Sequence, residues 1–306
     1  MRVAIYGGTG FLGSYLIDVL IASGHEPSVL VRAGSEHRLQ QANRCRAIPG
    51  DLNSAAAIEA TLENCDAIIY SVGILQEDPK QGITFESLQF DACVRVAEAA
   101  QSQGISRFLL MSANGVKSAG TPYQDTKFRA EQHVRDSGFD VTVFRPSVIF
   151  GDPGGKLEIA TQLFRDMIAP PLPAAGFFTG WHPFRGAVLM SPVHVTDVAM
   201  AVVRALEDSS TFGRTFELGG PEVLAWSEML RRIARSVGRR KWIVPMPIGL
   251  MSLAATLLGW LPFFPVTRDQ LQMLGEGNTA DPTELQILIG RPLIAFTPEN
   301  LAYLSP

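Results

Sequence analysis

Three glycines near the start of the chain constrain its fold more than any other feature. They are Gly7, Gly10 and Gly13 in the stretch AIYGGTGFLGSYL, residues 4–16, and they follow an apolar run directly. At a strand–loop–helix junction such glycines allow a tight turn, a close approach of the backbone to a pyrophosphate, and packing of the helix on the strand. The amide groups at the start of a helix over 11–23 would face that anion. The stretch predicts a dinucleotide-binding loop, and the alternative is a structural turn without a ligand.

The first half of the chain alternates short apolar runs with helical patterns. We expect strands over 2–7, 27–32, 46–52, 66–72, 107–113 and 140–146, and helices over 11–23, 35–43, 54–63, 85–103 and 123–137. The strand runs are continuously apolar, as in strands that are buried on both faces of a parallel sheet. This regular alternation predicts an α/β fold of the Rossmann type, with a doubly wound parallel sheet.

After about residue 150 this rhythm ends. Residues 169–186 are rich in proline, glycine and aromatic side chains, among them Phe177, Phe178, Trp181 and His182, which is typical of a long irregular loop or a small cap. Late elements are expected to return to the sheet over 191–208, 215–220 and 226–237. The chain is therefore expected to comprise two parts. Residues 1–150 would form a dinucleotide-binding Rossmann domain, and residues 151–306 a smaller, partly irregular substrate-side subdomain interleaved with late sheet elements.

The end of the second expected strand bears on which dinucleotide would bind. Sites specific for NAD often carry an acidic residue there for the ribose hydroxyls, whereas this chain has Arg32, with His37 and Arg38 nearby. A guanidinium suits a 2′-phosphate and would do little for a bare ribose. We therefore expect NADP(H) to be preferred and NAD(H) to remain an alternative. A solvent-facing arginine without a ligand is the other interpretation.

Residues at the ends of the next two strands complete the expected cofactor site. Asp51 in the motif GDL is placed to accept a hydrogen bond from the adenine amino group, and the main chain of YSVG, residues 70–73, would line the cofactor. The expected cofactor contacts are Gly7, Thr9, Gly10, Phe11, Leu12, Gly13, Arg32, Asp51, Leu52, Ser71, Val72, Gly73, Lys127 and Pro146.

Tyr123 and Lys127 are a candidate catalytic pair. They stand four residues apart in the helical run over 123–137, so they share one face of that helix. A tyrosine has a pKa near 10 and is a poor base at neutral pH, but a nearby ammonium and an oxidised nicotinamide would favour its phenolate. Tyr123 is then expected to exchange a proton with a substrate hydroxyl or carbonyl during hydride transfer, while Lys127 also bonds the cofactor ribose.

Six motifs occur in the order found in one enzyme superfamily. They read GGTGFLG, GDL, YSVG, PYQDTK, RPSVIFG and HVTDVA, and together they span about residues 1–200. On these motifs the chain resembles the short-chain dehydrogenase/reductase superfamily, and in length it resembles the extended, epimerase/dehydratase-like and atypical members. The stretch 111–152, followed by PVTRDQLQML, is most similar to the atypical group that includes the nucleotide-binding accessory subunit of respiratory complex I and its bacterial relatives.

This resemblance implies a Rossmann-type fold, NADP(H) binding and an active site that some members can dispense with. Catalytic members carry a serine or threonine after the fifth strand, which polarises the substrate carbonyl. Here Ser112 is the residue that would take this role. If Val116 is aligned with the pattern of the extended members, the carbonyl-polarising position falls on Ala113 instead, and Asn114 is another candidate hydrogen-bond donor. Ser112, Tyr123 and Lys127 are thus the expected catalytic residues.

Composition excludes several other functions. The formal net charge is −4 and the longest basic cluster is Arg239–Lys241, so no nucleic-acid partner is expected. The three cysteines, Cys45, Cys65 and Cys93, form no CxxC motif and fit reduced thiols in a cytoplasmic protein. Since no group of His, Cys and Asp has the spacing of metal ligands, no metal site is expected.

One apolar stretch, residues 245–266, bears on localisation. It is about as long as a membrane span requires, but prolines and glycines interrupt it, and its helical part over about 248–260 is too short to cross a bilayer. It is either a buried helix or a docking surface for a membrane or a protein partner. The first apolar run, Val3–Tyr6, is too short for a signal peptide. We expect a cytoplasmic protein, with association at the cytoplasmic face of a membrane as the alternative, and the oligomeric state stays open.

Two functions fit these observations. The first is an NADP(H)-dependent oxidoreductase or epimerase that acts on a hydroxyl or carbonyl group through Tyr123 and Lys127, on a substrate that the sequence does not identify. The second is a non-catalytic NADP(H)-binding scaffold or assembly protein that docks on a membrane-associated respiratory partner. Two features favour the second function: the alignment that puts the carbonyl-polarising position at Ala113, and the apolar stretch 245–266.

Overall fold

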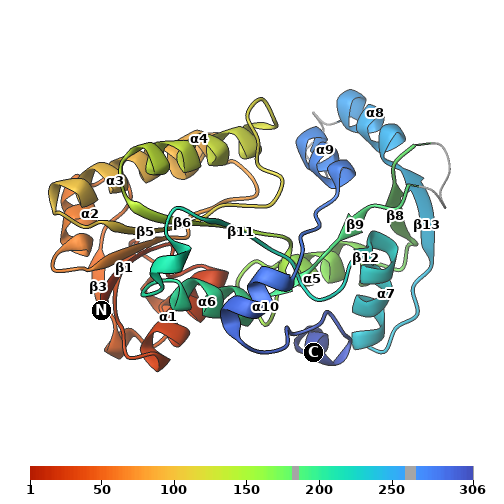
Figure 1. Ribbon diagram of the computed structural model, residues 1–306. Helices are drawn as coiled ribbons and strands as arrows, with labels where there is room; N and C mark the ends of the chain where they lie inside the picture. The colour runs from red at the N-terminus through yellow and green to blue at the C-terminus, as the bar shows by residue number, and fades with distance from the viewer. Residues whose placement is uncertain (181–185, 259–266, 306) are drawn as a thin grey trace. The chain divides into compact units, whose positions relative to one another are not determined.

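The chain forms two compact units, and each is described here by itself. The computed structural model describes residues 1–180, 186–258 and 267–305 (Figure 1). The first unit comprises Met1–Pro146, Val195–Glu217 and Thr283–Arg291. The second comprises Ser147–His194, Leu218–Pro282 and Pro292–Pro306.

A seven-stranded sheet forms the centre of the first unit. Its order is β11-β6-β5-β4-β1-β2-β3, and the pairings among β1 to β6 are all parallel. The strands are β1 Arg2–Tyr6, β2 Glu26–Val31, β3 Arg46–Pro49, β4 Ala67–Tyr70, β5 Arg107–Met111, β6 Asp140–Pro146 and β11 Thr215–Leu218. The chain starts in the middle of the sheet and builds outward in both directions, so the strand order reverses between β1 and β4. In open α/β sheets, ligands bind at the carboxyl ends of the strands at such a point.

Helices cover both faces of this sheet, as the continuously apolar strands require. α1 (Phe11–Ala22) and α6 (Val195–Arg204) pack together on one face, with α10 (Thr283–Ile289) against α6. α2 (Ala55–Leu62), α3 (Ala92–Ser102) and α4 (Pro122–Asp136) follow one another over the other face (Figure 1). The predicted doubly wound α/β fold is thereby confirmed.

Two expected helices of the first unit differ from the structure. Residues 35–43 do not form one helix but two single 3-10 turns, Glu36–Arg38 and Ala42–Arg44. Gln41 between them has a left-handed backbone, with φ 51°, which ends any regular helix at that point. The long run over 85–103 is helical, but its first part, Glu86–Asp91, is a π-helix that leads into α3.

The second unit consists of two-stranded ribbons and helices around its own core. β7 (Ile149–Phe150) pairs with β10 (Val193–His194), β9 (Leu189–Met190) with β12 (Leu224–Ala225), and β8 (Ala174–Phe178) with β13 (Ile243–Pro247). Its helices include α5 (Ile159–Leu163), α7 (Trp226–Ser236), α8 (Ile248–Leu258) and α9 (Arg268–Glu276). The amphipathic helix α7 buries Met229, Leu230 and Ile233 in this core.

The segment 169–186 is more regular than its composition suggests. It contains β8, which pairs in parallel with β13 along all five residues. Phe177 and Phe178 are buried, and the ring centroids of Phe177 and Trp226 lie 5.9 Å apart, so both phenylalanines belong to the core. Trp181 and His182 lie outside the described residues.

The apolar stretch 245–266 is also described only in part. Its first residues end β13, α8 follows, and residues 259–266 lie outside the described part of the chain. Within the described ranges, none of the helices combines the length and the hydropathy that crossing a bilayer requires.

Candidate dinucleotide and active site

The glycine loop joins β1 to α1 and is closed tightly on itself. Gly7 has φ +95°, and a Cβ atom there would lie 2.5 Å from the Ser71 carbonyl oxygen at the end of β4. A Cβ atom on Gly13 would lie 2.2 Å from the Gly7 carbonyl oxygen and 2.7 Å from Gly8 Cα. Since real Cβ atoms do not approach the backbone so closely, these two positions require glycine. The structure thus accounts for the spacing that the sequence displays.

The start of α1 is open to an anion. Gly10 is the N-cap residue, its amide donates to the Gly7 carbonyl oxygen at 3.0 Å, and no side chain caps the helix. The first turn of α1 carries no acidic residue. The first amides and the positive end of the helix dipole therefore meet no competing group of the helix itself, which fits a pyrophosphate.

The end of β2 presents a free cation. Arg32 follows the last strand residue, Val31, and its side chain is exposed. Within the described chain its guanidinium makes no ion pair or hydrogen bond, and His37 and Arg38 are exposed on the following turn. A 2′-phosphate at the end of β2 would therefore meet a guanidinium that no carboxylate of the described chain pairs with, although Glu36 is exposed on the same turn as His37 and Arg38.

The ends of β3 and β4 supply the remaining expected contacts. The Asp51 carboxylate is exposed and accepts the Asn53 amide at 2.8 Å, while the Leu52 carbonyl oxygen accepts the Arg95 guanidinium at 3.0 Å. Beyond β4, Ser71 and Val72 are half-buried and Gly73 is exposed. Among the other expected contacts, Thr9 and Phe11 are half-buried in or beside the glycine loop, and Leu12 and Pro146 are buried.

Gly73 connects the expected cofactor residues to the expected catalytic ones. A Cβ atom on Gly73 would lie 3.6 Å from Lys127 Nζ, so the loop after β4 passes directly beside this amine. The lysine is on α4, which begins at Pro122 with a capping box formed by Thr121 and Gln124. This cap fixes the first turn of α4, and with it the position of Tyr123.

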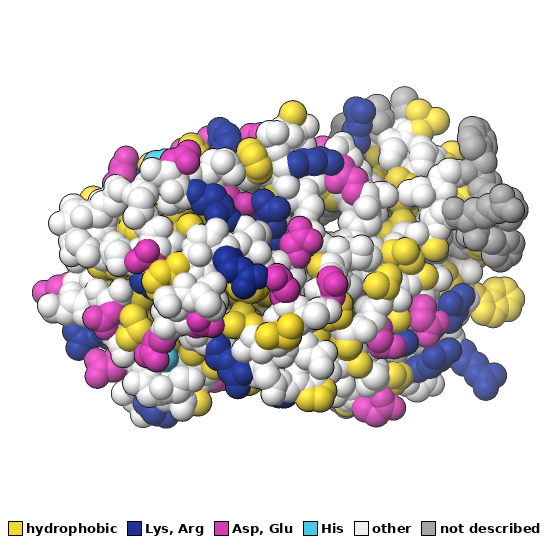
Figure 2. Space-filling model, in the orientation of Figure 1, with side chains coloured by type: hydrophobic (Ala, Val, Ile, Leu, Met, Phe, Trp, Pro, Cys, Tyr) yellow, Lys and Arg dark blue, Asp and Glu magenta, His cyan; other side chains and the backbone are white. Residues whose placement is uncertain are grey.

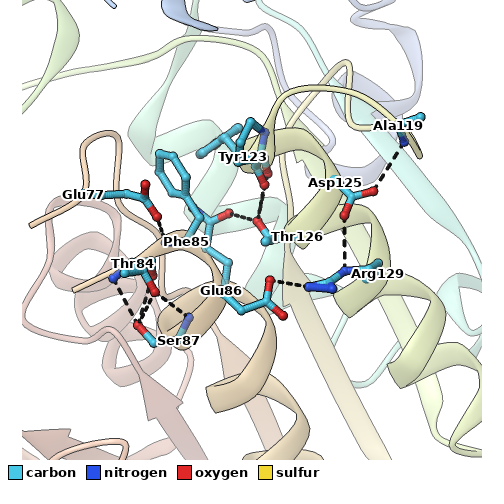
Figure 3. A network of polar contacts seen from close by, with 12 residues as sticks. Glu77, Thr84, Phe85, Glu86, Ser87, Ala119, Tyr123, Asp125, Thr126 and Arg129 are labelled. Carbon is cyan, nitrogen blue, oxygen red and sulfur yellow. Dashed lines mark hydrogen bonds and ion pairs between the residues drawn. The ribbon is translucent and has the colours of Figure 1, made fainter. Parts of the chain in front are cut away.

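Tyr123 and Lys127 are brought together, as their spacing predicts. Lys127 Nζ lies 5.8 Å from the centroid of the Tyr123 ring. The Phe85 ring packs edge-on against the same Tyr123 ring, with the two centroids 5.6 Å apart (Figure 3). The Tyr123 hydroxyl makes no hydrogen bond to any described residue, yet it is not among the buried unpartnered atoms. The Tyr123 residue as a whole is half-buried.

Burial shifts both groups of this pair away from their charged forms. It raises the pKa of the Tyr123 phenol to about 12 and lowers the pKa of the Lys127 amine to about 8. Lys127 is buried, and its Nζ donates to the Met111 carbonyl oxygen at 3.1 Å. Without a cofactor, these surroundings favour a neutral phenol at physiological pH.

Ser112 and Lys127 line the same small cavity. Its side chain is buried, and Oγ has no hydrogen-bond partner in the described part of the chain. Together with Lys127, Gln89 and Tyr70 it lines a small cavity beneath α4, and Tyr123 is not among the residues that line this cavity. Of the three expected catalytic residues, the structure thus groups Ser112 with Lys127 and Lys127 with Tyr123. Ala113 and Asn114 are half-buried after the strand end.

Gln89 is a site residue that sequence reasoning did not find. Its side-chain amide donates to the Ile74 carbonyl oxygen at 3.2 Å, and its Oε1 accepts the Thr126 hydroxyl at 3.0 Å. It therefore joins the loop after β4 to α4, beside the cavity that holds Lys127. No motif distinguishes a glutamine within a helical run, so the only signal would have been its place on the buried face.

An exposed ionic network fixes α4 next to this site. The Arg129 guanidinium contacts Glu86 at 2.5 Å and Asp125 at 3.3 Å, and the Phe85 amide donates to Glu77 at 2.7 Å (Figure 3). These contacts tie the π-helix and the loop before it to the first turns of α4. They hold the Phe85 ring against Tyr123, which positions the phenol.

Lys127→Met is expected to raise the free energy of unfolding at neutral pH by about 2 kcal/mol, because it removes a buried ammonium at the loss of one hydrogen bond. The unfolded lysine keeps its ordinary pKa of 10.5, whereas the folded one titrates at about 8. Between these values the unfolded chain binds more protons, so wild-type stability rises with pH and the advantage of the variant shrinks.

Urea unfolding from neutral pH to about pH 10 measures this change. Lys80→Met, which alters an exposed lysine, is the control and is expected to show no such trend. If the gain of Lys127→Met is the same at every pH, burial of the charge is not its cause.

Comparisons with known proteins agree with this geometry. Residues 7–167 match the family described as NAD(P)H-binding. The chain is 26% identical over 288 residues to the mitochondrial NADH-ubiquinone oxidoreductase 40 kDa subunit of Neurospora crassa, covering 91% of this chain and 72% of that protein. It is 26% identical over 272 residues to a ceramide reductase of Caulobacter vibrioides, covering 84% of this chain and 78% of that protein.

More distant similarities point to the same fold. A UDP-glucose 4-epimerase of Vibrio cholerae is 21% identical over 281 residues, which cover 84% of this chain and 82% of that protein. The crystal structure of gox2253 has a TM-score of 0.77 at 20% identity and covers 99% of this chain and 96% of its own. MoeE5 in complex with UDP-glucose and NAD has a TM-score of 0.72, also at 20% identity, with 99% and 97% covered.

Proposed function

Because the chain belongs to the NAD(P)H-binding family, we propose that it is an NADP(H)-dependent oxidoreductase acting on a carbonyl or hydroxyl group. The observation that carries this proposal is the position of Lys127. Its buried amine lies beside Gly73 on the expected cofactor side and under the Tyr123 ring on the expected substrate side. Relatives named as a reductase and as an epimerase support an enzymatic role.

Each residue of the pair has a separate task in this proposal. The bound nicotinamide supplies or accepts the hydride. Tyr123, whose phenol is held neutral by its surroundings, donates a proton to the substrate oxygen, so the site is suited to carbonyl reduction. Lys127, fixed by the Met111 carbonyl oxygen, stabilises the phenolate that remains.

Ser112 has a positioning task rather than direct contact with the substrate. Ser112 and Lys127 line the same small cavity, and the Ser112 Oγ has no hydrogen-bond partner in the described part of the chain, so it is placed to bind a water molecule there. This assignment fits the alignment on Val116, in which the carbonyl-polarising position falls on Ala113.

The function is tested by NADPH oxidation. The purified protein is incubated with NADPH and a set of carbonyl compounds, and the loss of reduced cofactor is followed by absorbance. We expect turnover with at least one substrate class and a dependence on Tyr123. Tight NADPH binding without turnover on any class would contradict the enzymatic proposal and favour the second function below.

Arg32→Ala is expected to lower NADPH affinity by about 10- to 100-fold, because a guanidinium–phosphate hydrogen bond contributes roughly 1.5–3 kcal/mol. Affinity for NADH should hardly change, so the preference between the two cofactors narrows. Titration of intrinsic fluorescence measures both constants. Arg44→Ala, which alters another exposed arginine, is the control. Equal affinities of the unaltered protein for NADPH and NADH would refute the role of Arg32.

The second candidate is a non-catalytic, NADP(H)-binding scaffold or assembly protein. Two observations favour it, the similarity to a subunit of NADH-ubiquinone oxidoreductase and the absence of Tyr123 from the described residues that line the Ser112 cavity. In this role, bound NADPH would stabilise the fold by mass action while the protein docks on a membrane-associated partner at the cytoplasmic face. A rise in the melting temperature with NADPH but no turnover is the expected result.

A further inference from the structure

A basic and aromatic surface lies in the second unit, on residues separate from the cofactor site. An open pocket of about 360 Å³ is lined by Ile168, Pro170–Pro173 and Arg239–Trp242. We call the two segments 168–173 and 239–242 the Arg–Trp edge. They precede β8 and β13, the two strands that pair in parallel. Their lining side chains are prolines, apolar residues and three cations.

Hydrogen bonds hold the two segments of the Arg–Trp edge together. Lys241 Nζ donates to the carbonyl oxygens of Ile168, at 2.9 Å, and of Pro170. The Arg239 guanidinium donates to the Ala169 carbonyl oxygen at 3.1 Å, and the amide that begins β8 donates to the Trp242 carbonyl oxygen at 2.8 Å. These hydrogen bonds fix the position of the two segments of the Arg–Trp edge relative to each other.

The positive charge of this surface is not compensated. None of the residues that line the pocket is acidic, and Arg239 and Arg240 are exposed. In the part of the chain that is described, Arg240 has no ion pair or hydrogen bond. Neighbouring arginines differ, because Arg165 pairs with Asp166 and Arg235 with Glu228. The uncompensated charge favours an anionic partner.

Large apolar side chains project from the same surface. Trp242 is 82% exposed and Leu172 is 70% exposed. Val244, two residues after Trp242 and so on the same side of β13, is also exposed. Leu250 and Leu253 of α8 are exposed as well, but α8 begins at the other end of β13 from Trp242, so they are not part of this surface. Figure 2 shows yellow and dark-blue side chains beside one another along the edge of the molecule drawn over β13 and α7.

We propose that the Arg–Trp edge binds the surface of an anionic lipid bilayer. Arginines suit lipid phosphates, and an exposed tryptophan and leucine suit the boundary between headgroups and acyl chains. Basic side chains and an apolar anchor each bind a bilayer weakly, and together they give stable peripheral attachment. A nucleic acid would use the arginines but would leave Leu172 and Val244 in water, so a lipid surface fits the set better.

Vesicle co-sedimentation of the full chain tests this proposal. We expect binding to vesicles of phosphatidylcholine mixed with phosphatidylglycerol, little binding to phosphatidylcholine alone, and weakening by salt. Arg240→Glu is expected to lower the affinity about 30-fold, since each charge near such a surface contributes about 1 kcal/mol and reversal changes two. Trp242→Ala is expected to lower it about tenfold by removing the apolar anchor.

Two variants on the first unit are matched controls. Arg44→Glu reverses another exposed arginine, and Ile287→Ala removes a side chain that is 74% exposed on α10. Neither should change vesicle binding. Equal binding to neutral and anionic vesicles, an Arg44→Glu effect as large as that of Arg240→Glu, or binding only to a soluble protein partner would overturn the proposal. All variants should bind NADPH as the unaltered protein does, so a failure here is separate from a failure of the proposed enzymatic function.

Discussion

Gly13→Ala is expected to lower NADPH affinity about 100-fold and the free energy of unfolding by about 2 kcal/mol or more. The added methyl group would lie 2.2 Å from the Gly7 carbonyl oxygen and 2.7 Å from Gly8 Cα. Both atoms belong to the backbone, so neither can move without opening the loop between β1 and α1. Alanine gains about 1 kcal/mol of helix propensity at this position, which the overlap exceeds.

Gly249→Ala provides the matched control for this change. Gly249 is also a helical glycine, on α8, but no heavy atom lies within 4 Å of the Cβ atom that it would gain. Its substitution should leave NADPH affinity unchanged and stabilise the protein by up to about 1 kcal/mol. Urea unfolding and fluorescence titration measure both variants. A Gly13→Ala protein with normal NADPH affinity would show that this loop is not the cofactor site.

The Rossmann core could be predicted because its signals are local. The helix expected over 11–23 is α1, Phe11–Ala22, and the strand expected over 140–146 is β6, Asp140–Pro146. A strand that is buried on both faces needs a continuous apolar run, and its helix needs a cap and a stop, all within about 20 residues. The glycine spacing likewise reflects contacts between neighbouring residues, so the sequence alone displays it.

The second unit could not be predicted because its structure depends on distant pairing. β8 forms only against β13, and the paired residues Ala174 and Ile243 are far apart in the chain. Prolines and glycines around β8 hide it from any local pattern. The helix expected over 35–43 fails for the opposite reason, since the left-handed residue Gln41 breaks an otherwise helical composition.

The candidate active site was predictable in part. The spacing of Tyr123 and Lys127 reflects one helix face, and the structure brings the two side chains together. The surroundings of Ser112 depend on where β5 ends and on which side chains of α4 lie over that point. Neither can be predicted from a single stretch of sequence. The same holds for Gln89, whose role comes from contacts with Ile74 and Thr126.

Tyr123→Phe is expected to lower turnover by about 10²- to 10⁴-fold, the usual contribution of general acid–base catalysis, and to leave NADPH affinity unchanged. The substitution removes only a hydroxyl that has no hydrogen-bond partner among the described residues, while the ring keeps its edge-on contact with Phe85. The free energy of unfolding should therefore stay the same, so a loss of activity would reflect the missing proton donor and not a change in the fold.

Tyr303→Phe is the matched control for this last experiment. Its hydroxyl accepts the Gly151 amide at 3.2 Å and hydrogen-bonds the buried Glu158 carboxylate in the second unit, so its loss should cost about 3 kcal/mol of stability with little effect on turnover. Single-turnover and steady-state kinetics of both variants separate the chemical step from cofactor binding. Since the Tyr123 phenol donates its proton to the substrate oxygen in the proposed reduction, turnover that survives Tyr123→Phe would remove Tyr123 from the mechanism and assign the proton to another donor.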